Sequence, residues 1–138
     1  MTAPISCVFC GILEGRLPAR IVYEDEHHIA FLPLEHINPG HVLLIPRTHI
    51  DDLFDLDEPA YQRLWAVAAR LAAPLREALS AKRVGVAVEG FNVPHVHVHL
   101  VPLHAVDELT PARARTLDDA ETDRLWRLLR QSFLTLRK

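Results

Sequence analysis

Apolar residues recur at helical spacing in two long segments of the chain. In Asp57–Leu79 they fall every three or four residues, the repeat that places them on one face of a helix. Asp57 suits the N-cap of that helix, and Pro74 is a position at which the helix kinks or divides. The same spacing predicts a helix over Asp118–Leu136, and a short helix is expected over Cys7–Glu14.

Short runs rich in β-branched and apolar residues predict the strands. Pro and Gly separate several of these runs, and Asn38-Pro39-Gly40 is a strong turn signal. The expected strands are Ala19–Asp25, His28–Leu32, His41–Ile45, Val84–Val88 and His95–Val101. The first two form a hairpin around an acidic turn. Strands packed with helices place the chain in the α+β class.

Length and composition narrow the kind of protein. With 138 residues, 49% of them hydrophobic, the chain is expected to form one compact domain. Acids and bases are interspersed to a net charge of -3, which does not favour a nucleic-acid partner. No apolar run is long enough to span a bilayer, and the first six residues show no signal segment. We therefore expect a cytoplasmic protein without a membrane partner.

Three histidines alternate with aliphatic residues in His95-Val96-His97-Val98-His99-Leu100. In a strand, alternate side chains share a face, so the imidazoles would line one side while the aliphatic residues enter the core. One alternative is a solvent face decorated with histidines. Another is a single metal bound by all three, but rings spaced along a whole strand do not converge easily on one ion; two of them could. The remaining histidines His27, His28 and His104 are expected at the surface.

The two cysteines, Cys7 and Cys10, are too close in sequence to staple a fold. In a reducing compartment this spacing indicates a metal site or redox chemistry. As zinc ligands the two thiolates fill half of a tetrahedral site and need two further ligands. A thioredoxin-like pair is the weaker alternative, because no βαβ pattern flanks it, and a pair of buried thiols is the third.

Several motifs in a fixed order carry a resemblance to a known family. They include the Cys pair, Asn38-Pro39-Gly40-His41, Arg47-Thr48-His49 and the three alternating histidines. The chain resembles the histidine triad (HIT) family, in its bacterial branch near the nucleoside phosphoramidases, from Cys7 to Pro102. The resemblance implies a HIT-like fold: an antiparallel sheet of about five strands with a short N-terminal, a long middle and a C-terminal helix. Within a single domain, 1–138, the core would span about 7–102 and a helical extension about 110–138.

The resemblance also implies a mechanism. The position of His97 is that of the nucleophile that attacks the α-phosphate of a nucleotide derivative. The position of His99 is that of a hydrogen-bond donor to the phosphate, and His41 lines the same pocket. The mechanism requires the central ring to be reachable and free of metal. In zinc-bearing relatives a structural Cys₂His₂ site is formed at the positions of Cys7, Cys10, His49 and His95.

Substrate contacts follow from the same resemblance. Apolar residues at the positions of Phe9, Leu17 and Leu32 sandwich the base, although ordinary core packing explains them equally well. Gly90 and Asn92 match the turn that contacts the phosphate. Two departures stand out: Pro33 replaces the aspartate that binds ribose, and the turn before the triad is shorter and lacks the usual Asn and Ser.

The implied activity is hydrolysis of nucleoside monophosphate derivatives such as adenosine phosphoramidates by a symmetric homodimer. Two alternatives stay open. The same nucleophile serves enzymes that cleave dinucleoside polyphosphates or transfer nucleotidyl groups. A zinc-stabilised module that binds nucleotides or proteins without catalysis is the other.

Overall fold

The structure, a computed structural model, describes residues 6–136. The prediction that the N-terminus carries no signal segment falls mainly on residues 1–5, which lie outside the described residues. Three α-helices and five strands are joined by short 3₁₀ turns. The elements in chain order are α1 (Val8–Leu13), β1 (Ile21–Glu24), β2 (His28–Phe31), β3 (Val42–Pro46), η1 (Leu53–Asp55), α2 (Glu58–Ala78), β4 (Arg83–Ala87), β5 (Val98–Leu103), η2 (Pro111–Arg113), α3 (Asp119–Phe133) and η3 (Leu134–Leu136).

The strands form one five-stranded antiparallel sheet in the order β1-β2-β3-β5-β4. This confirms the α+β class, the strand number and the three helices. The predicted hairpin is also present, but its first strand begins at Ile21 rather than Ala19, and its register shifts between Ile21 and Tyr23. None of the helices described in residues 6–136 is long and apolar enough to cross a membrane.

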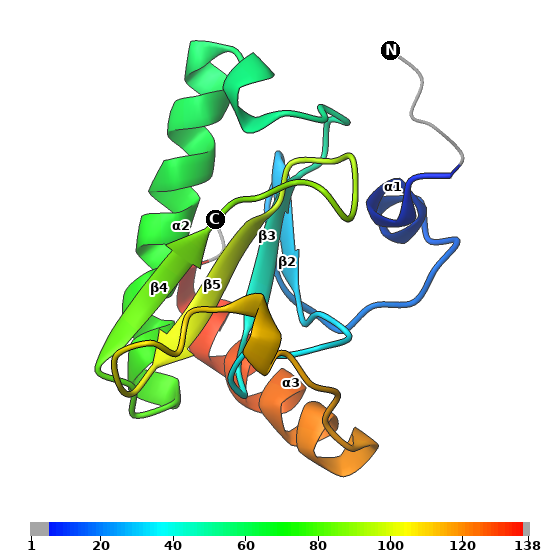
Figure 1. Cartoon of the computed structure of the whole chain (residues 1–138). Helices are drawn as coiled ribbons and strands as arrows, with labels where there is room; N and C mark the ends of the chain where they lie inside the picture. Colours follow the sequence, from blue (N-terminus) through cyan, green and yellow to red (C-terminus); the bar gives the residue numbers. More distant parts are fainter. Residues whose placement is uncertain (1–5, 137–138) are drawn as a thin grey trace.

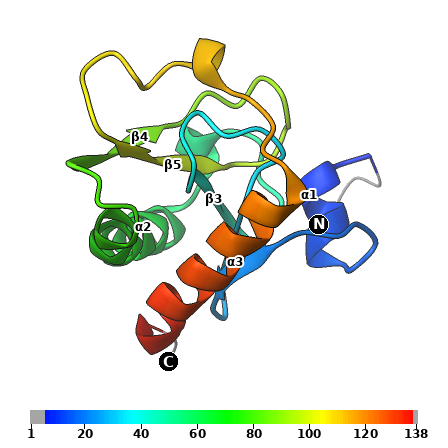
Figure 2. The ribbon, with the colours of Figure 1, turned by 90° about the horizontal axis from the view of Figure 1, so that it is seen from below.

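Each strand sends alternate side chains to the two faces of the sheet. One face, which we call the helix face, packs against α2 and α3; its buried strand residues include Ala30, Leu44, Val98 and Leu100. The opposite face, which we call the site face, packs against α1 through a second cluster that includes Phe31 and Leu43. Figure 2 shows α2 on one side of β4 and β5 and the loop after β5 on the other. Since both faces are covered, every residue of β2 and β3 is buried.

The two long helices close the helix face. Asp57 caps α2 by accepting the Ala60 N–H, as its position predicts. Pro74 does not divide this helix, which continues to Ala78. The C-terminal helix α3 buries Leu125, Leu129 and Phe133 in the same core as the strands. The organisation of 1–138 as a single domain stays a prediction, although α3 shares its core with the sheet.

The strand expected over His95–Val101 lies further along the chain. Strand β5 begins at Val98 and ends at Leu103. Before it, the His95 N–H donates to the Val93 carbonyl and the Val96 N–H to the Ile50 carbonyl, so this stretch leaves the ladder with β3. Only His99 of the three histidines is in a strand. Val96, Val98 and Leu100 are nevertheless buried on the helix face, which confirms the alternation.

Candidate functional site

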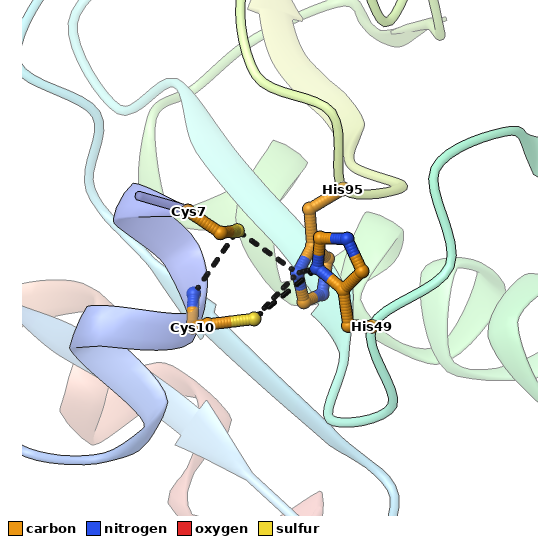
Figure 3. A group of neighbouring side chains, drawn as sticks. All are labelled: Cys7, Cys10, His49 and His95. Carbon is orange, nitrogen blue, oxygen red and sulfur yellow. Dashed lines mark hydrogen bonds between the residues drawn. The ribbon is translucent and has the colours of Figure 1, made fainter. Parts of the chain in front are cut away.

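Four side chains from three parts of the chain meet beside the N-terminal end of α1 (Figure 3). Cys7 is the N-cap of α1, and its Sγ accepts the Cys10 N–H at 3.3 Å. A cysteine cap followed three residues later by a second cysteine turns both thiols to the same side of the helix start. His49 comes from the loop after β3 and His95 from the loop before β5. All four ligand atoms lie within 4.8 Å of one another.

The distances within this cluster fit a tetrahedral metal ion. The Nδ1 atoms of His49 and His95 are 3.3 Å apart. Nδ1 of His95 lies 3.5 Å from each thiol sulfur, and Nδ1 of His49 lies 3.2 Å from the Cys10 sulfur. Bonds of the usual length from one zinc-sized ion predict edges of roughly 3.3 Å between two nitrogens and 3.6 Å between nitrogen and sulfur. The four residues could therefore hold a metal ion.

Electrostatics point in the same direction. Burial, together with the neighbouring Cys7, raises the pKa of the Cys10 thiol to about 11, so a cation is needed to hold this sulfur as a thiolate at neutral pH. Burial also lowers the pKa of His95 and keeps the ring neutral. Nε2 of His95 donates to the Pro46 carbonyl at 2.9 Å. That bond leaves the Nδ1 lone pair free as a ligand.

His97 follows the metal cluster along the chain and lies against Phe9, with 5.1 Å between ring centroids. Its Nδ1 donates to the His95 carbonyl at 2.7 Å, so in the neutral ring the lone pair is on Nε2. The side chain is only 5% exposed. Its Nε2 forms no hydrogen bond with the described residues. This nitrogen is still reachable, because it is not one of the fully buried nitrogens without a partner. The ring is thus largely buried, is not in the metal cluster, and keeps Nε2 open.

His99 is the neighbour of His97, with 5.1 Å between ring centroids. Its Nδ1 lies 2.9 Å from Nε2 of His41. The backbone N–H of Ile37 donates to Nδ1 of His41 at 3.0 Å. A neutral His41 therefore carries its proton on Nε2 and donates it to Nδ1 of His99. The proton of His99 is then on its own Nε2, where it can be donated to a ligand.

Both rings of this pair are neutral near pH 7. Burial lowers the pKa of His41 to about 3, and the neighbouring His99 and His36 add to the shift. Burial lowers the pKa of His99 to about 4, with a further contribution from His97. The five histidines of the site thus divide into two candidate metal ligands, His49 and His95, one ring with a free lone pair, His97, and one hydrogen-bonded donor pair, His41 with His99.

The predicted substrate residues are not all brought together. Phe9 lies beside His97 on the site face, as above. Leu17 is 41% exposed and packs over Gly11. Leu32 belongs to the core of the helix face, so the structure does not bring it beside Phe9. Gly90, with φ +87°, and the exposed Asn92 lie in the loop between β4 and β5 that also supplies His95.

Two buried histidines were not predicted. His28 was expected at the surface and is buried; its Nδ1 lies 3.0 Å from a carboxylate oxygen of Asp25. The spacing of an aspartate three residues before a histidine could have indicated this contact. His36 is 1% exposed, and neither ring nitrogen has a hydrogen-bond partner among residues 6–136. Its ring stands against His41 at 6.2 Å between centroids.

Comparison with known proteins decides the family. A model of the HIT domain matches residues 14–106. The chain belongs to the HIT domain family. This HIT protein is 32% identical over 132 residues to an uncharacterized HIT-like protein of Mycobacterium tuberculosis strain H37Rv, covering 91% of this chain and 92% of the relative. The resemblance seen in the sequence is thereby confirmed.

Solved structures agree with the family assignment. A Zn-bound histidine triad family protein from Mycobacterium smegmatis superposes with a TM-score of 0.82 at 36% identity, covering 96% of each chain. A hypothetical histidine triad nucleotide-binding protein from Sulfolobus tokodaii gives a TM-score of 0.80 at 26% identity, covering 94% of this HIT protein and 93% of the relative. The family comprises nucleotide-binding hydrolases and transferases. The fold and the metal-binding geometry of this HIT protein agree with that assignment.

Proposed function

We propose that this HIT protein hydrolyses nucleoside monophosphate derivatives, adenosine phosphoramidates being the preferred class, through a nucleotidyl intermediate on His97. The observation that carries the proposal is the bond from Nδ1 of His97 to the His95 carbonyl. It fixes the lone pair on Nε2, which is the form of imidazole that attacks phosphorus.

The bonds made and broken are few. Nε2 of His97 attacks the α-phosphorus, the bond from phosphorus to the leaving nitrogen breaks, and the leaving amine takes up a proton from solvent. Water then attacks the same phosphorus and gives up a proton to solvent, and the bond to Nε2 breaks. The products are the amine, the nucleoside monophosphate and free His97.

His99 supports this chemistry as a donor. Since His41 donates to its Nδ1, His99 presents Nε2–H next to His97. That N–H suits a non-bridging phosphate oxygen, on which negative charge builds in the transition state. A donor held in place in this way contributes about 10²–10³ in rate in comparable sites.

We infer that the metal cluster binds zinc and that its role is structural. Two thiolates and two imidazoles form a closed tetrahedral set with no open position for a reactive water. The Mycobacterium smegmatis relative is a Zn-bound protein. In this chain the ion would tie α1 to the loop before β5 and so fix the His95 carbonyl that orients His97.

Substrate contacts complete the proposal. Phe9 beside His97 is suited to pack on the base, with Leu17 at the exposed end of the same segment. Gly90 and Asn92 are proposed to face the phosphate. Leu32 is left as a core residue. Pro33 has no acceptor side chain for ribose, so we propose that affinity comes mainly from the base and the phosphate.

We further propose a homodimer in the cytoplasm. Strand β4 pairs only with β5 among the described strands and leaves its other edge free, and Val86 on it is 44% exposed. The groove between this strand and α2 is lined by Ala69, Ala72, Ala73, Arg76, Lys82, Arg83 and Val84. The three alanines are small and allow close approach of a second copy. The free thiols of Cys7 and Cys10 suit a reducing compartment. Sedimentation should give twice the chain mass of 15.6 kDa.

The test of function is a direct comparison of substrates. A fluorogenic adenosine phosphoramidate should be turned over faster than diadenosine tetraphosphate, and His97→Ala should abolish both activities while retaining nucleotide binding. Faster cleavage of the tetraphosphate would assign the protein to the polyphosphate hydrolases. Binding without turnover of any nucleotide by the unmutated protein would make it a non-catalytic module.

A further inference from the structure

The segment between β5 and α3, residues 104–117, arches over the site face (Figure 1, yellow to orange). Most of it lies beyond residues 14–106, which match the HIT domain. It contains one short 3₁₀ turn, η2, and returns to the sheet before α3. We call it the strap. Its side chains and backbone are bonded to the loop between β2 and β3, which precedes His41.

A side-chain cluster fastens the strap at one point. Nδ2 of the buried Asn38 donates to the Pro102 carbonyl at 2.8 Å and to Glu108 at 3.1 Å. The guanidinium of Arg113 donates to Oδ1 of Asn38 at 2.8 Å. Glu108 also accepts the backbone N–H groups of His104 and Ala105. Both the oxygen and the nitrogen of the Asn38 side-chain amide are therefore hydrogen-bonded to the strap or to the end of β5.

A pair of backbone bonds fastens it at a second point. The His36 N–H donates to the Arg115 carbonyl at 2.8 Å, and the Arg115 N–H donates to the His36 carbonyl at 3.0 Å. The peptide group that carries this His36 carbonyl also carries the Ile37 N–H. That N–H donates to Nδ1 of His41 at 3.0 Å, and His41 in turn donates to His99.

We propose that the strap is a positioning device for the active site, acting through the Arg115 N–H. The proposal rests on the proposed function of His97 and His99. The hydrogen bonds run without a break from the Arg115 N–H to the peptide of His36 and Ile37, to His41, and to His99. Arg115 thus contributes to the reaction without touching the substrate.

The physical reason is the choice of tautomer. A neutral His41 free of the Ile37 N–H populates both the Nδ1–H and the Nε2–H forms, and only the second donates to His99. When the carbonyl oxygen of a peptide group accepts a hydrogen bond, the N–H of the same peptide group becomes a stronger donor, because chains of hydrogen bonds polarise one another. Loss of the Arg115 N–H leaves the peptide less polarised and free to rotate. His99 then loses its fixed Nε2–H, and with it the donor to the phosphate.

The sharpest test compares Arg115→Pro with Arg115→Ala. Both substitutions remove the guanidinium, and only proline removes the N–H while keeping the carbonyl that accepts from His36. Ala114, at φ -63° and ψ 131°, has the extended backbone that a following proline requires. We expect kcat for an adenosine phosphoramidate to be about tenfold lower in Arg115→Pro than in Arg115→Ala, with KM and metal content equal in the two variants.

A spectroscopic readout separates positioning from a loss of structure. Nitrogen-15 spectra of the imidazoles should show His41 as the Nε2–H tautomer in the unmutated protein and in Arg115→Ala, and a mixture of tautomers in Arg115→Pro. Equal kcat values and an unchanged His41 tautomer would overturn the proposal. If the unmutated protein turns over no nucleotide, the proposed function fails, while the tautomer measurement still decides the role of the strap.

A second pair of variants guards against a proline that fails to fold. Arg113→Met removes the bond to Asn38 at the first fastening point. Arg113 also lies 3.9 Å from a carboxylate oxygen of Glu108. Arg124→Met, on α3 and away from the strap, removes an arginine with a comparable contact, 3.8 Å from Glu121. We expect Arg113→Met to lower kcat several-fold relative to Arg124→Met, with equal melting temperatures within a few degrees. The first fastening point is expected to hold the Arg115 N–H in place, so equal kcat values in this pair would contradict a positioning role of the strap as a whole.

Discussion

Nε2 of His41 lies 2.9 Å from Nδ1 of His99, and this contact orders the proton donors of the site. The direction of the bond follows from the Ile37 N–H, which occupies the other nitrogen of His41. The carbonyl of His95 sets the neighbouring His97 in the complementary form. One ring therefore offers a lone pair and the next an N–H, which is the combination that nucleophilic attack on a phosphate requires.

The first prediction separates these two rings. His97→Ala should reduce turnover of an adenosine phosphoramidate by at least about 10³-fold, because no other imidazole in the pocket has its lone pair free. His99→Ala should lower kcat by about 10²-fold and still form a covalent nucleotidyl enzyme, detectable by mass spectrometry after an acid-free quench. Equal losses with no covalent species in either variant would be incompatible with the assigned roles.

The second prediction concerns the metal. Cys7→Ala should lower the zinc content and the melting temperature together, since metal binding by the folded site contributes folding free energy. Val8→Ala is the matched control, because Val8 is the next residue of the same segment and is exposed. Zinc is measured by inductively coupled plasma mass spectrometry. Full zinc occupancy in Cys7→Ala would exclude the ligand set.

The third prediction concerns His36, whose ring is buried and whose two nitrogens have no hydrogen-bond partner in the part of the chain that the structure describes. A buried polar group without a partner destabilises the fold by about 1–3 kcal/mol. His36→Phe keeps a ring of similar shape and removes the two polar atoms, so we expect a higher melting temperature at pH 7. Chemical denaturation should give the same m-value for both proteins. A variant that is clearly less stable would show that the ring nitrogens are satisfied in solution.

Much of this architecture could be predicted from the sequence, and most of the failures are long-range. The alternation of Val96, Val98 and Leu100 identified buried positions correctly, because burial follows from the local period. The departure of His95 from the strand depends on the Val96 N–H meeting the Ile50 carbonyl, a contact that no local pattern reports. The pairing of His36 with Arg115 joins residues 79 positions apart and is equally invisible in the sequence. The contact of His28 with Asp25 is local and was simply missed.

The last prediction is an acid-dependent loss of stability centred on His36. Burial, with a smaller contribution from Arg115, lowers the pKa of His36 to about 4 in the folded protein, from 6.5 for the free side chain. Between these two values the unfolded chain binds the proton and the folded chain does not, so the free energy of unfolding falls as the pH falls from 6.5 to 4. His41 acts in the same direction, because burial lowers its pKa to about 3.

The variant His36→Phe isolates the contribution of one ring. Relative to the unmutated protein, its advantage in unfolding free energy should grow by about 2–3 kcal/mol between pH 7 and pH 4, because it has no proton to bind at this position. Urea denaturation at half-unit pH steps measures the two curves, and carboxylates that titrate in the same range cancel in the difference. Parallel curves across this window would mean that His36 is already accessible to protons in the folded state, contrary to its burial.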